Sequence, residues 1–395
     1  MNAARCRLIY AEILELPRPQ AHALQILRTA EALARKGAEV HAWARLEERI
    51  DLGRALTEVL GRTPPESLHL HALLSTHKGI AGLVYRMRLF ARLLPPRDRR
   101  TVFLGRSRRH TLALLRAKRR LRSRARVVYE FHNVESELAR EAGDPERALA
   151  IAAEERELST RADGLWAISA PLAEDVARLF APPRAPAVIQ DGVDVEAFRG
   201  AGERSLTRAE ATLLYAGSLH PYKGVEDLLA MLAFLPRNVR LEIVGGHPAS
   251  ELERLRRTAT SDAGLGERVR FAGLVPPSDV RRHMEEADLI VLPAGRGLRG
   301  SRYTSPLKLF EAMASGLPIA AAPTPALTSV LEDGKTAFVA AGDGPRELAR
   351  AVERALEDRT RARSIGREAA RAAEAYDWTA RAERILELVG SLSAG

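Results

Sequence analysis

The sequence predicts an α/β protein made of two domains, each built on a parallel sheet. Short apolar runs alternate with amphipathic helical segments along the whole chain, a pattern typical of parallel sheets with helices on both faces. The length of 395 residues is long for one hydrophobic core, which indicates two domains of ordinary size. Prolines and glycines gather at 181–204, and this segment is the predicted linker between the two halves.

The first half is expected to alternate strands and helices from its start. Short apolar runs predict the strands, and the apolar period of 22–36, stopped by Gly37, predicts the first helix. The expected strands lie at 8–10, 40–44, 127–131 and 165–169.

The second half restarts the same alternation. Its expected strands lie at 212–216, 241–244, 269–271, 289–292 and 319–321, and its expected helices at 225–235, 249–258, 278–286, 306–314, 345–357 and 360–374. A last helix is expected at 379–392, directly after Trp378. The predicted domains are therefore 1–187 and 188–376, with a terminal helix at 377–395.

The stretch 302–320 carries the strongest functional signal, because it reads as a loop, a helix and a buried strand in succession. Ser305 is a good N-cap and Pro306 suits the first helical position. Gly316 ends the helix, and an apolar residue at every third position gives it a core-facing side.

Two charged residues on this helix predict a binding site for a nucleoside diphosphate. Lys308 lies near the helix start, where unpaired backbone N–H groups favour anions. Glu311 lies about one and a half turns into the helix, where a carboxylate can accept from two adjacent hydroxyls, as on a ribose. The structural alternative is an ordinary capped helix of an α/β domain.

A second motif follows the expected strand 212–216. Gly217 allows the backbone to approach a ligand closely, and Lys223 supplies a point charge for a diphosphate. Because many strands end in a glycine turn with a nearby lysine, this loop alone does not identify a site.

These motifs resemble the retaining glycosyltransferases of family 4. Their GT-B fold has two Rossmann-like domains with parallel sheets facing an interdomain cleft, and a C-terminal helix that crosses back to the first domain. Residues 305–311, Ser-Pro-Leu-Lys-Leu-Phe-Glu, match the form found in one branch of the family. The resemblance implies that Glu311 holds the donor ribose. Two positions depart from the family pattern: Tyr303 replaces a glutamate and Ser218 replaces an arginine of the diphosphate loop. We expect Lys308 to supply the charge of that arginine.

The resemblance also implies the remaining donor contacts. The strand and loop at 271–275 are expected to read the base through the backbone. The implied donor-binding residues are Gly217, Ser218, Gly273, Leu274, Val275, Thr304, Ser305, Pro306 and Leu307. The donor is a nucleotide-diphosphate-sugar, and no separate cofactor is expected. No metal site is expected either, since the sequence has no Asp-x-Asp motif and no cluster with metal-ligand spacing.

In the first half, His132 follows the expected strand 127–131, at the edge where open α/β sheets bind ligands. A lone histidine is more often structural than catalytic, but this one resembles the family's strand-end histidine that contacts the donor sugar. We expect it to orient the sugar or to stabilise charge. The implied acceptor-side residues are His22, Gln25, Arg106 and Asn133, and the loop 17–25 lacks the family's Gly-Gly pair.

The positive charge of the chain is concentrated in one segment. The net charge is +10, and 86–126 alone holds 16 basic residues and one acid. Amphipathic helices expected at 80–94 and 111–124 carry many of these residues. We therefore expect 79–126 to suit an anionic membrane surface or an anionic acceptor, with a solvated basic face as the plain alternative. No nucleic-acid partner is expected, since aromatic residues make up 5% and no known binding motif is present.

Several other classes are disfavoured by composition. Cys6 is the only cysteine, so no intrachain disulfide can form. No apolar run approaches the ~18 residues of a membrane span, and the N-terminus lacks a signal-peptide core. The absence of a Walker A loop and of Gly-x-Gly-x-x-Gly argues against NTPases and dehydrogenases. A cytoplasmic protein, peripheral on the inner face of the membrane if the basic helices bind it, is expected.

The sequence as a whole predicts a retaining, metal-independent hexosyltransferase of glycan biosynthesis. The acceptor would be a hydroxyl of a saccharide, a lipid-linked glycan or a small molecule. The expected catalytic residues are His132, Lys223, Lys308 and Glu311, with the leaving phosphate as the base that the family resemblance implies. Two alternatives remain: a nucleotide-sugar epimerase or hydrolase on the same fold, and a catalytically degraded, membrane-associated binding protein.

Overall fold

The computed structural model describes residues 6–15, 21–46, 51–74, 78–92, 101–203, 210–261, 264–305 and 307–392. Contacts divide the chain into a first unit, Met1–Gly192 with Trp378–Gly395, and a second unit, Val193–Asp377. The first unit thus extends past residue 187, where the sequence suggested a boundary, and recovers the chain at its C-terminal end.

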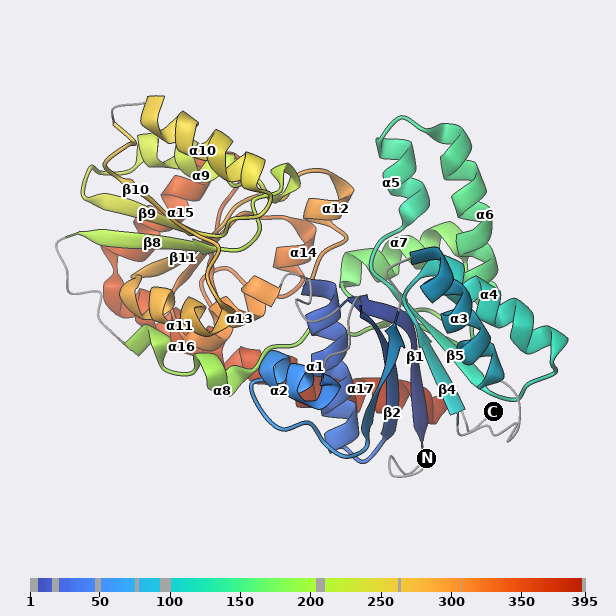
Figure 1. The fold of residues 1–395 in the computed structure, drawn as a ribbon. Coiled ribbons are helices and arrows are strands. Elements are labelled where there is room, and N and C mark those ends of the chain that lie inside the picture. The colour runs from blue at the N-terminus through green and yellow to red at the C-terminus, as the bar shows by residue number, and fades with distance from the viewer. Residues whose placement is uncertain are drawn as a thin grey trace. The chain divides into compact units, whose positions relative to one another are not determined.

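A seven-stranded parallel sheet forms the centre of the first unit (Figure 1). Its strand order is β3-β2-β1-β4-β5-β6-β7. The strands are β1 (Arg7–Glu15), β2 (Glu39–Leu46), β3 (Leu68–Leu74), β4 (Thr101–Gly105), β5 (Arg126–Phe131), β6 (Gly164–Ala167) and β7 (Ala187–Val188). The direction of strand addition reverses between β1 and β4, and open α/β sheets bind ligands beyond the carboxyl ends of the strands at such a reversal.

Eight helices belong to the described part of the first unit. They are α1 (Ala21–Arg35), α2 (Leu52–Leu60), α3 (Lys78–Ala91), α4 (Arg108–Arg120), α5 (Glu135–Glu141), α6 (Pro145–Arg161), α7 (Ala170–Phe180) and α17 (Trp378–Ser391). The terminal helix α17 packs against α1, which confirms that the end of the chain returns to the first unit (Figure 1). A side chain at Gly192 would place its Cβ 2.5 Å from the Trp378 ring, so only glycine fits where this helix begins.

The second unit is built on a six-stranded parallel sheet with the order β10-β9-β8-β11-β12-β13. Its strands are β8 (Ala211–Ala216), β9 (Val239–Val244), β10 (Val269–Gly273), β11 (Leu289–Leu292), β12 (Ile319–Ala321) and β13 (Phe338–Val339). The reversal of strand order lies between β8 and β11. The loop after β8 therefore lies where the topology favours a ligand.

Helices cover both faces of this second sheet (Figure 1). They are α8 (Val195–Phe198), α9 (Glu226–Met231), α10 (Ala249–Ser261), α11 (Pro277–Glu286), α12 (Gly297–Ser301), α13 (Leu307–Ser315), α14 (Pro325–Thr328), α15 (Pro345–Glu357) and α16 (Arg359–Ala373). In β11, Leu289 and Val291 join one apolar cluster, whereas Ile290 and Leu292 join the other. A strand that is buried on both sides reads as a continuous apolar run, which is why the alternation predicted this class.

The structure confirms the predicted α/β class with two parallel sheets, and it adds elements that the sequence did not reveal. The proposed linker 181–204 contains β7, the last strand of the first sheet, and α8. The expected helix 225–235 is shorter, because a 3₁₀ turn at Leu232–Phe234 follows α9. Over the described residues, no helix combines the length and apolar character needed to cross a membrane.

Candidate functional site

The loop after β8 packs tightly in the second unit. Gly217 N–H donates to Val244 O over 2.8 Å, and a Cβ on Gly245 would lie 2.0 Å from Gly217 O. Gly245 has a φ of +155°, a backbone conformation that L side chains rarely adopt. A Cβ on Gly217 would lie 3.2 Å from Lys308 Cδ, so this glycine lets the lysine of α13 run directly beside the loop.

Lys308 extends over the aromatic ring of Tyr215. Its Nζ lies 4.2 Å from the ring centroid and donates to the Tyr215 hydroxyl over 3.1 Å, while that hydroxyl donates to Ser218 O over 2.7 Å. Burial and the nearby charge of Lys223 hold the pKa of Lys308 well below its usual range. Within the described residues, Lys308 has no carboxylate partner at ion-pair distance. An anion at this place would remove the cost of holding the ammonium.

Lys223 ends a 3₁₀ turn, Pro221–Lys223, and its Nζ lies 5.1 Å from the Tyr222 ring centroid. Gly224 closes the turn with a φ of +70°, and a Cβ there would lie 2.0 Å from Ala294 O, so glycine is required. Burial and the charge of Arg299 lower the pKa of Lys223 to about 8. The loop therefore holds a second ammonium that lacks a carboxylate partner among the described residues.

Arg299 is a cation near this loop that the sequence analysis missed. It lies on α12, and its guanidinium carbon is 5.9 Å from the Tyr222 ring centroid. A Cβ on Gly300 would lie 2.3 Å from Tyr222 O, so this glycine allows α12 to contact the turn that carries Lys223. The glycines that flank Arg299 in Gly-Leu-Arg-Gly were the available signal.

Glu311 lies in the second turn of α13 and is partly buried. Burial raises the pKa of its carboxyl to about 7. No hydrogen bond or ion pair engages this carboxylate within the described residues. A buried acceptor without a donor is costly, and adjacent hydroxyl groups of a ligand would satisfy it.

The expected base-reading segment ends β10. Gly273 has a φ of +75°, and its carbonyl accepts from Gly245 N–H over 2.8 Å. Leu274 is 80% exposed, whereas Val275 packs against the apolar core. A Cβ on Gly246 would lie 2.8 Å from Leu274 N, so the backbones of the two loops are in close contact. An exposed leucine beside these closely packed loops suits the flat face of a nucleobase.

The start of α13 is only partly described. Ser305 is buried, Thr304 is partly exposed, and Leu307 begins the helix, whereas Pro306 lies outside the described residues. Tyr303 is 3% exposed, and its N–H donates to Leu298 O over 2.8 Å. A buried aromatic ring therefore occupies the position where the family pattern has its first glutamate.

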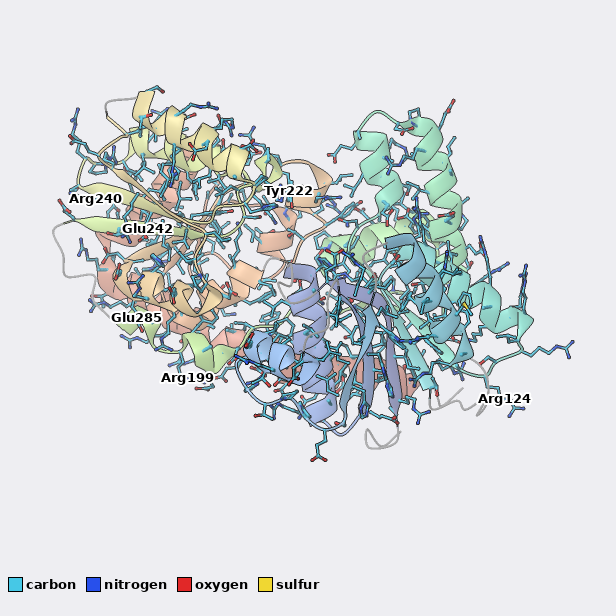
Figure 2. The ribbon with its side chains drawn as sticks, viewed as in Figure 1. Arg124, Arg199, Tyr222, Arg240, Glu242 and Glu285 are labelled. Atoms are coloured by element: carbon cyan, nitrogen blue, oxygen red, sulfur yellow. The ribbon has the colours of Figure 1, made fainter. Side chains whose placement is uncertain are left out.

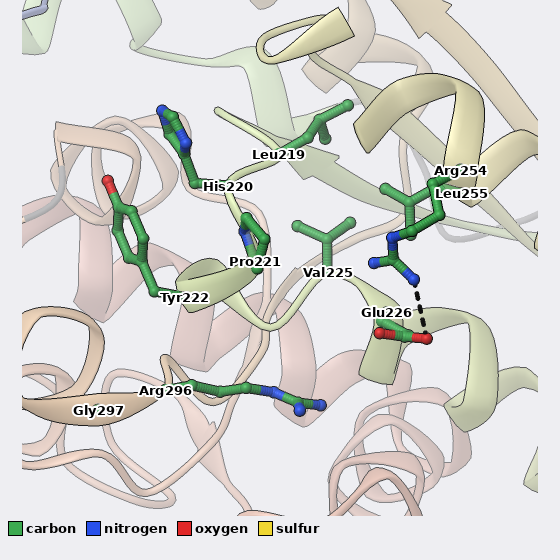
Figure 3. Close-up of a pocket in the computed structure, with 10 residues that line it drawn as sticks. All are labelled: Leu219, His220, Pro221, Tyr222, Val225, Glu226, Arg254, Leu255, Arg296 and Gly297. Atoms are coloured by element: carbon green, nitrogen blue, oxygen red, sulfur yellow. Dashed lines mark hydrogen bonds and ion pairs between the residues drawn. The ribbon is translucent and has the colours of Figure 1, made fainter. Parts of the chain in front are cut away.

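A cavity of about 310 Å³ flanks the turn that carries Lys223 (Figure 3). His220 and Tyr222 border it with stacked rings whose centroids are 5.3 Å apart. On another side, Arg254 Nη1 donates to Glu226 over 3.1 Å, as the dashed line in Figure 3 shows. The turn thus has open space on one flank.

In the first unit, His132 follows β5, and its Nε2 lies 3.1 Å from Glu130 Oε1. Burial lowers the pKa of His132, so the imidazole is neutral near pH 7. Glu130 is 2% exposed, and burial alone would raise its pKa, but His132 and Arg381 hold that pKa well below its usual range. Glu130 is therefore an ionised carboxylate at the strand end, and the sequence analysis assigned it no role.

Glu130 is surrounded by donors. Arg381 Nη2 lies 2.6 Å and Gln25 Nε2 3.2 Å from Glu130 Oε1, and Arg106 donates to the side-chain oxygen of Gln25. Of the predicted acceptor-side residues, Gln25 and Arg106 thus join His132 in one network. His22 contributes its carbonyl, which accepts from Arg106 over 3.4 Å, while its side chain is exposed. Asn133 is partly exposed.

Arg381 anchors this network from the terminal helix α17, and it is 2% exposed. Besides Glu130, it donates to Ile189 O over 2.9 Å, to Gln190 O, and through Nε to Thr29 Oγ1 over 3.1 Å. A guanidinium offers five donors in a fixed plane, so it can join several chain segments at once. An arginine at a core-facing position of an amphipathic helix was the only sequence signal for this role.

The basic helices of the first unit expose an unexpected apolar surface. The core-facing residues of α3 are Tyr85 and Leu89, whereas Leu83, Val84 and Met87 are 54%, 37% and 65% exposed. The apolar stripe that predicted an amphipathic helix therefore lies largely outside the core. Exposed apolar side chains beside arginines are typical of helices that lie in a membrane interface.

Part of the basic charge is neutralised within the first unit. Arg116 Nη2 lies 2.7 Å from Glu157, and Lys118 Nζ lies 2.6 Å from Asp163. Figure 2 shows Arg124 at the margin of this unit, beyond the end of α4. Three arginines at the end of α4 and beyond it have no carboxylate partner among the described residues: Arg120, Arg122 and Arg124.

Two glycosyltransferase family models match the chain. Residues 23–197 match the model described as Glycosyltransferase Family 4, and residues 210–358 match the model described as Glycosyl transferases group 1. Similar curated proteins are D-inositol 3-phosphate glycosyltransferases. The one from Nocardia farcinica is 30% identical over 59% of this chain and 53% of its own length. The one from Streptomyces avermitilis is 29% identical over 64% of this chain and 57% of its own length. The chain thus spans little more than half the length of these relatives.

Solved structures share the fold over almost the whole chain. Anabaena HepE in complex with UDP and glucose superposes with a TM-score of 0.71, covers 97% of this chain and 99% of its own, and is 18% identical. Sucrose-phosphate synthase from Thermosynechococcus elongatus gives a TM-score of 0.76 and 19% identity, covering 99% and 100%. The fold of two parallel-sheet α/β units is therefore the GT-B fold, as the sequence predicted.

Proposed function

We propose that this GT-B protein, whose two halves match glycosyltransferase family models, transfers a sugar from a nucleotide-diphosphate-sugar to an acceptor hydroxyl. One observation carries the proposal: Lys223 on the switch-point loop of the second unit and Lys308 beside that loop are desolvated, which lowers the pKa of both, and neither has a carboxylate partner among the described residues. Perturbed cations of this kind cluster at functional sites.

The two lysines would hold the diphosphate and stabilise it as it leaves. Negative charge grows on the leaving group as the glycosidic bond to the donor breaks, so preorganised cations lower the barrier. The low local polarity around Lys308 strengthens that interaction relative to water. Ser218 offers no charge at the position of the family's arginine, and Arg299 is a candidate to supply it together with Lys308.

The rest of the donor would be held by Glu311 and the end of β10. The unpartnered Glu311 carboxylate would accept from the two ribose hydroxyls, and Leu274 would cover the base while the backbone of Gly273 reads its edge. The Anabaena neighbour is described in complex with UDP and glucose, so UDP-sugars are the first donors to test. The remaining implied contacts come from 217–218 and 304–307.

We assign His132 to the sugar and acceptor side of the reaction. A neutral imidazole can accept or donate one hydrogen bond, and its Nε2 lies 3.1 Å from the Glu130 carboxylate. Retention of the anomeric configuration would follow if the leaving phosphate takes the acceptor proton on the face that the sugar leaves, with no metal needed. His22, Gln25, Arg106 and Asn133 would line the acceptor side.

The acceptor is proposed by chemical class only. The curated relatives are named for an inositol phosphate, which is a small phosphorylated polyol, and the unpaired arginines beyond α4 suit an anionic acceptor or an anionic membrane. The exposed Leu83 and Met87 favour the membrane, because apolar side chains gain nothing from a soluble phosphate. A lipid-linked acceptor presented at an anionic surface combines both features.

A turnover assay tests the proposal. UDP release from a panel of UDP-sugars is measured with and without acceptor candidates, and the product anomer is assigned by NMR. We expect acceptor-dependent UDP release that Lys308→Met lowers by about 10²- to 10³-fold, while the matched control Lys335→Met, an exposed lysine of the same unit, leaves it unchanged. Release without acceptor would indicate a hydrolase, and conversion without release an epimerase. Lipid binding without any turnover would indicate a degraded binding protein.

A further inference from the structure

Three histidines and a glutamate gather at the edge of the first sheet. Glu39 and His41 lie on β2, and His69 and His71 lie on β3, each pair two residues apart. In the parallel register, His41 pairs with His69 and Trp43 pairs with His71. Because side chains two residues apart on a strand share one face, all four side chains project from the same face of the sheet.

The polar atoms of this cluster are in close contact. His41 Nε2 lies 3.0 Å from Glu39 Oε1, and His41 Nδ1 lies 2.9 Å from His71 Nε2. The rings of His41 and His69 stack with centroids 4.8 Å apart. One ligand atom from each of Glu39, His41 and His69 lies within 4.8 Å of the other two. This separation is close enough for one ion to bridge all three after small side-chain adjustments.

We infer that Glu39, His41 and His69 form a binding site for a divalent transition metal of the zinc class. Two imidazole nitrogens and one carboxylate oxygen are a ligand set that suits zinc and leaves a further position for water. Magnesium and calcium prefer oxygen ligands alone, so they are not expected to bind. The proposed glycosyl transfer does not use these residues.

Neighbouring groups support the ligands. Without metal, the contact with the Glu39 carboxylate requires His41 Nε2–H to donate, so His41 Nδ1 accepts from His71 Nε2–H. A metal bound at Nε2 would take the place of that proton, and His41 Nδ1–H would then donate to His71 Nε2, as ligating histidines usually require. Arg7 Nε donates to Glu39 Oε2 over 3.0 Å, which leaves Oε1 for the metal. Thus His71 acts as a positioning residue for His41, and Arg7 acts as one for Glu39.

Nearby positive charges limit the expected affinity of this site. The nearby charges of Arg7, Arg88 and Arg92 oppose a cation, so we expect micromolar rather than tighter affinity.

Sequence spacing concealed this cluster, because the ligands come from two strands that are adjacent only in the folded sheet. β3 is the edge strand of that sheet, so an ion shared between β2 and β3 would tie the edge to its neighbour. Metal binding should therefore stabilise the first unit and leave the second unit's transition unchanged.

Metal titration of the untagged 395-residue chain tests the inference. After treatment with a chelator, Co²⁺ is added and its visible absorption is recorded, and Zn²⁺ and Mg²⁺ are titrated by calorimetry and thermal unfolding. We expect one Zn²⁺ per chain, the absorption bands of four-coordinate Co²⁺, and a rise in the melting temperature with Zn²⁺ but not with Mg²⁺. Chelator should reverse the rise.

Variants locate the site. His69→Gln removes an exposed ligand without disturbing the core, and we expect loss of Co²⁺ absorption and of the Zn²⁺ response. His71→Gln should weaken binding by about 10- to 100-fold. His247→Gln, which removes an imidazole from the second unit, should bind as the wild type does. No metal response in the wild-type chain, or an undiminished response in His69→Gln, would show that the cluster is only a hydrogen-bonded network.

Discussion

The charged groups of the two units differ in one respect that bears on function. In the first unit, Glu130 receives donors from Arg381 and Gln25, and its buried charge is satisfied by the protein itself. In the second unit, Lys308 and Glu311 are desolvated, and no opposite charge faces either of them among the described residues. A network whose charges are all paired holds its side chains in one arrangement, whereas an unpaired desolvated charge is stabilised when a ligand of opposite charge or a hydrogen-bonding ligand binds. We therefore expect the first cluster to be needed for stability and the second for binding and turnover.

Removing the anchor of the satisfied network should have the largest effect. Arg381→Met leaves Glu130 buried without its closest cation, so we expect the free energy of unfolding of the first unit to fall by about 3–5 kcal/mol. Urea titration followed by tryptophan fluorescence measures this, since Trp43 and Trp166 lie in the first unit's core. Arg119→Met, an exposed arginine of the same unit, should change stability by less than about 0.5 kcal/mol.

For Lys308→Met we expect a large loss of turnover and no loss of stability. Turnover should fall by about 10²- to 10³-fold, because a cation directed at the leaving group is lost. Stability should hold or rise, since the methionine fills the place of a desolvated ammonium without its charge. The measurements are kcat under saturating donor and the melting temperature of the same preparation. A stability loss as large as that of Arg381→Met would remove the distinction between the two units.

Glu311→Gln should weaken nucleotide binding by about 1.5–3 kcal/mol, because hydrogen bonds from ribose hydroxyls to a charged acceptor are lost. The chemical counterpart is a 2′-deoxynucleotide, which removes one of those hydroxyls. The wild type should discriminate against it, and Glu311→Gln should discriminate much less. Calorimetry of the nucleotide and the 2′-deoxynucleotide with the wild type and with Glu311→Gln completes a double-mutant cycle. Additive losses of binding free energy would mean that Glu311 does not contact the ribose.

Nucleotide affinity should depend on pH through Lys223, whose pKa is about 8 in the free protein. A diphosphate favours the ammonium form, so the pKa of Lys223 rises on binding. The contribution of Lys223 to affinity is therefore constant below pH 8 and falls above it, by up to about tenfold for each pH unit until the pKa of the bound state is reached. Titrations from pH 7 to 9.5 measure the profile. Lys223→Arg should flatten it, and an unchanged slope would assign the titration to another group.

The smallest effect is expected at the membrane. Replacing the exposed Leu83 or Met87 with serine should weaken the free energy of binding to anionic liposomes by about 1 kcal/mol each, because an apolar side chain that would be partly buried in the membrane is lost. Liposome flotation measures this binding. Leu149→Ser is the matched control, since Leu149 is 69% exposed on α6 of the same unit. Equal flotation of all variants would leave the arginines as a solvated face.

The sequence predicted the second unit's site better than the first unit's, for a physical reason. Lys308 and Glu311 lie on one short helix, and Lys223 follows a strand end, so local spacing places each residue. The contact between Glu130 and Arg381 joins a strand to the terminal helix, and no local pattern encodes it. For the same reason, the histidines of β2 and β3 could not be recognised as a cluster before the register was known.

The sequence also predicted some strands of the fold better than others. Strands buried on both faces, such as β11, were found because they form uninterrupted apolar runs. Edge strands such as β3 and β7 were missed, because β3 mixes histidine with leucine and β7 lies among prolines. The apolar period of α3 correctly predicted a helix, but its periodic apolar residues are largely exposed. Periodicity predicts that apolar residues share one side of a helix, and it does not predict whether that side is buried.

A thermal-stability screen against UDP, GDP, ADP and dTDP tests whether the unsatisfied charges of the second unit form a nucleotide site. We expect a selective rise in melting temperature with one nucleotide. That rise should be lost in Glu311→Ala and retained in Glu357→Ala, an exposed glutamate on α15. No rise with any nucleotide at millimolar concentration, or a rise that survives Glu311→Ala and Lys308→Met together, would contradict it.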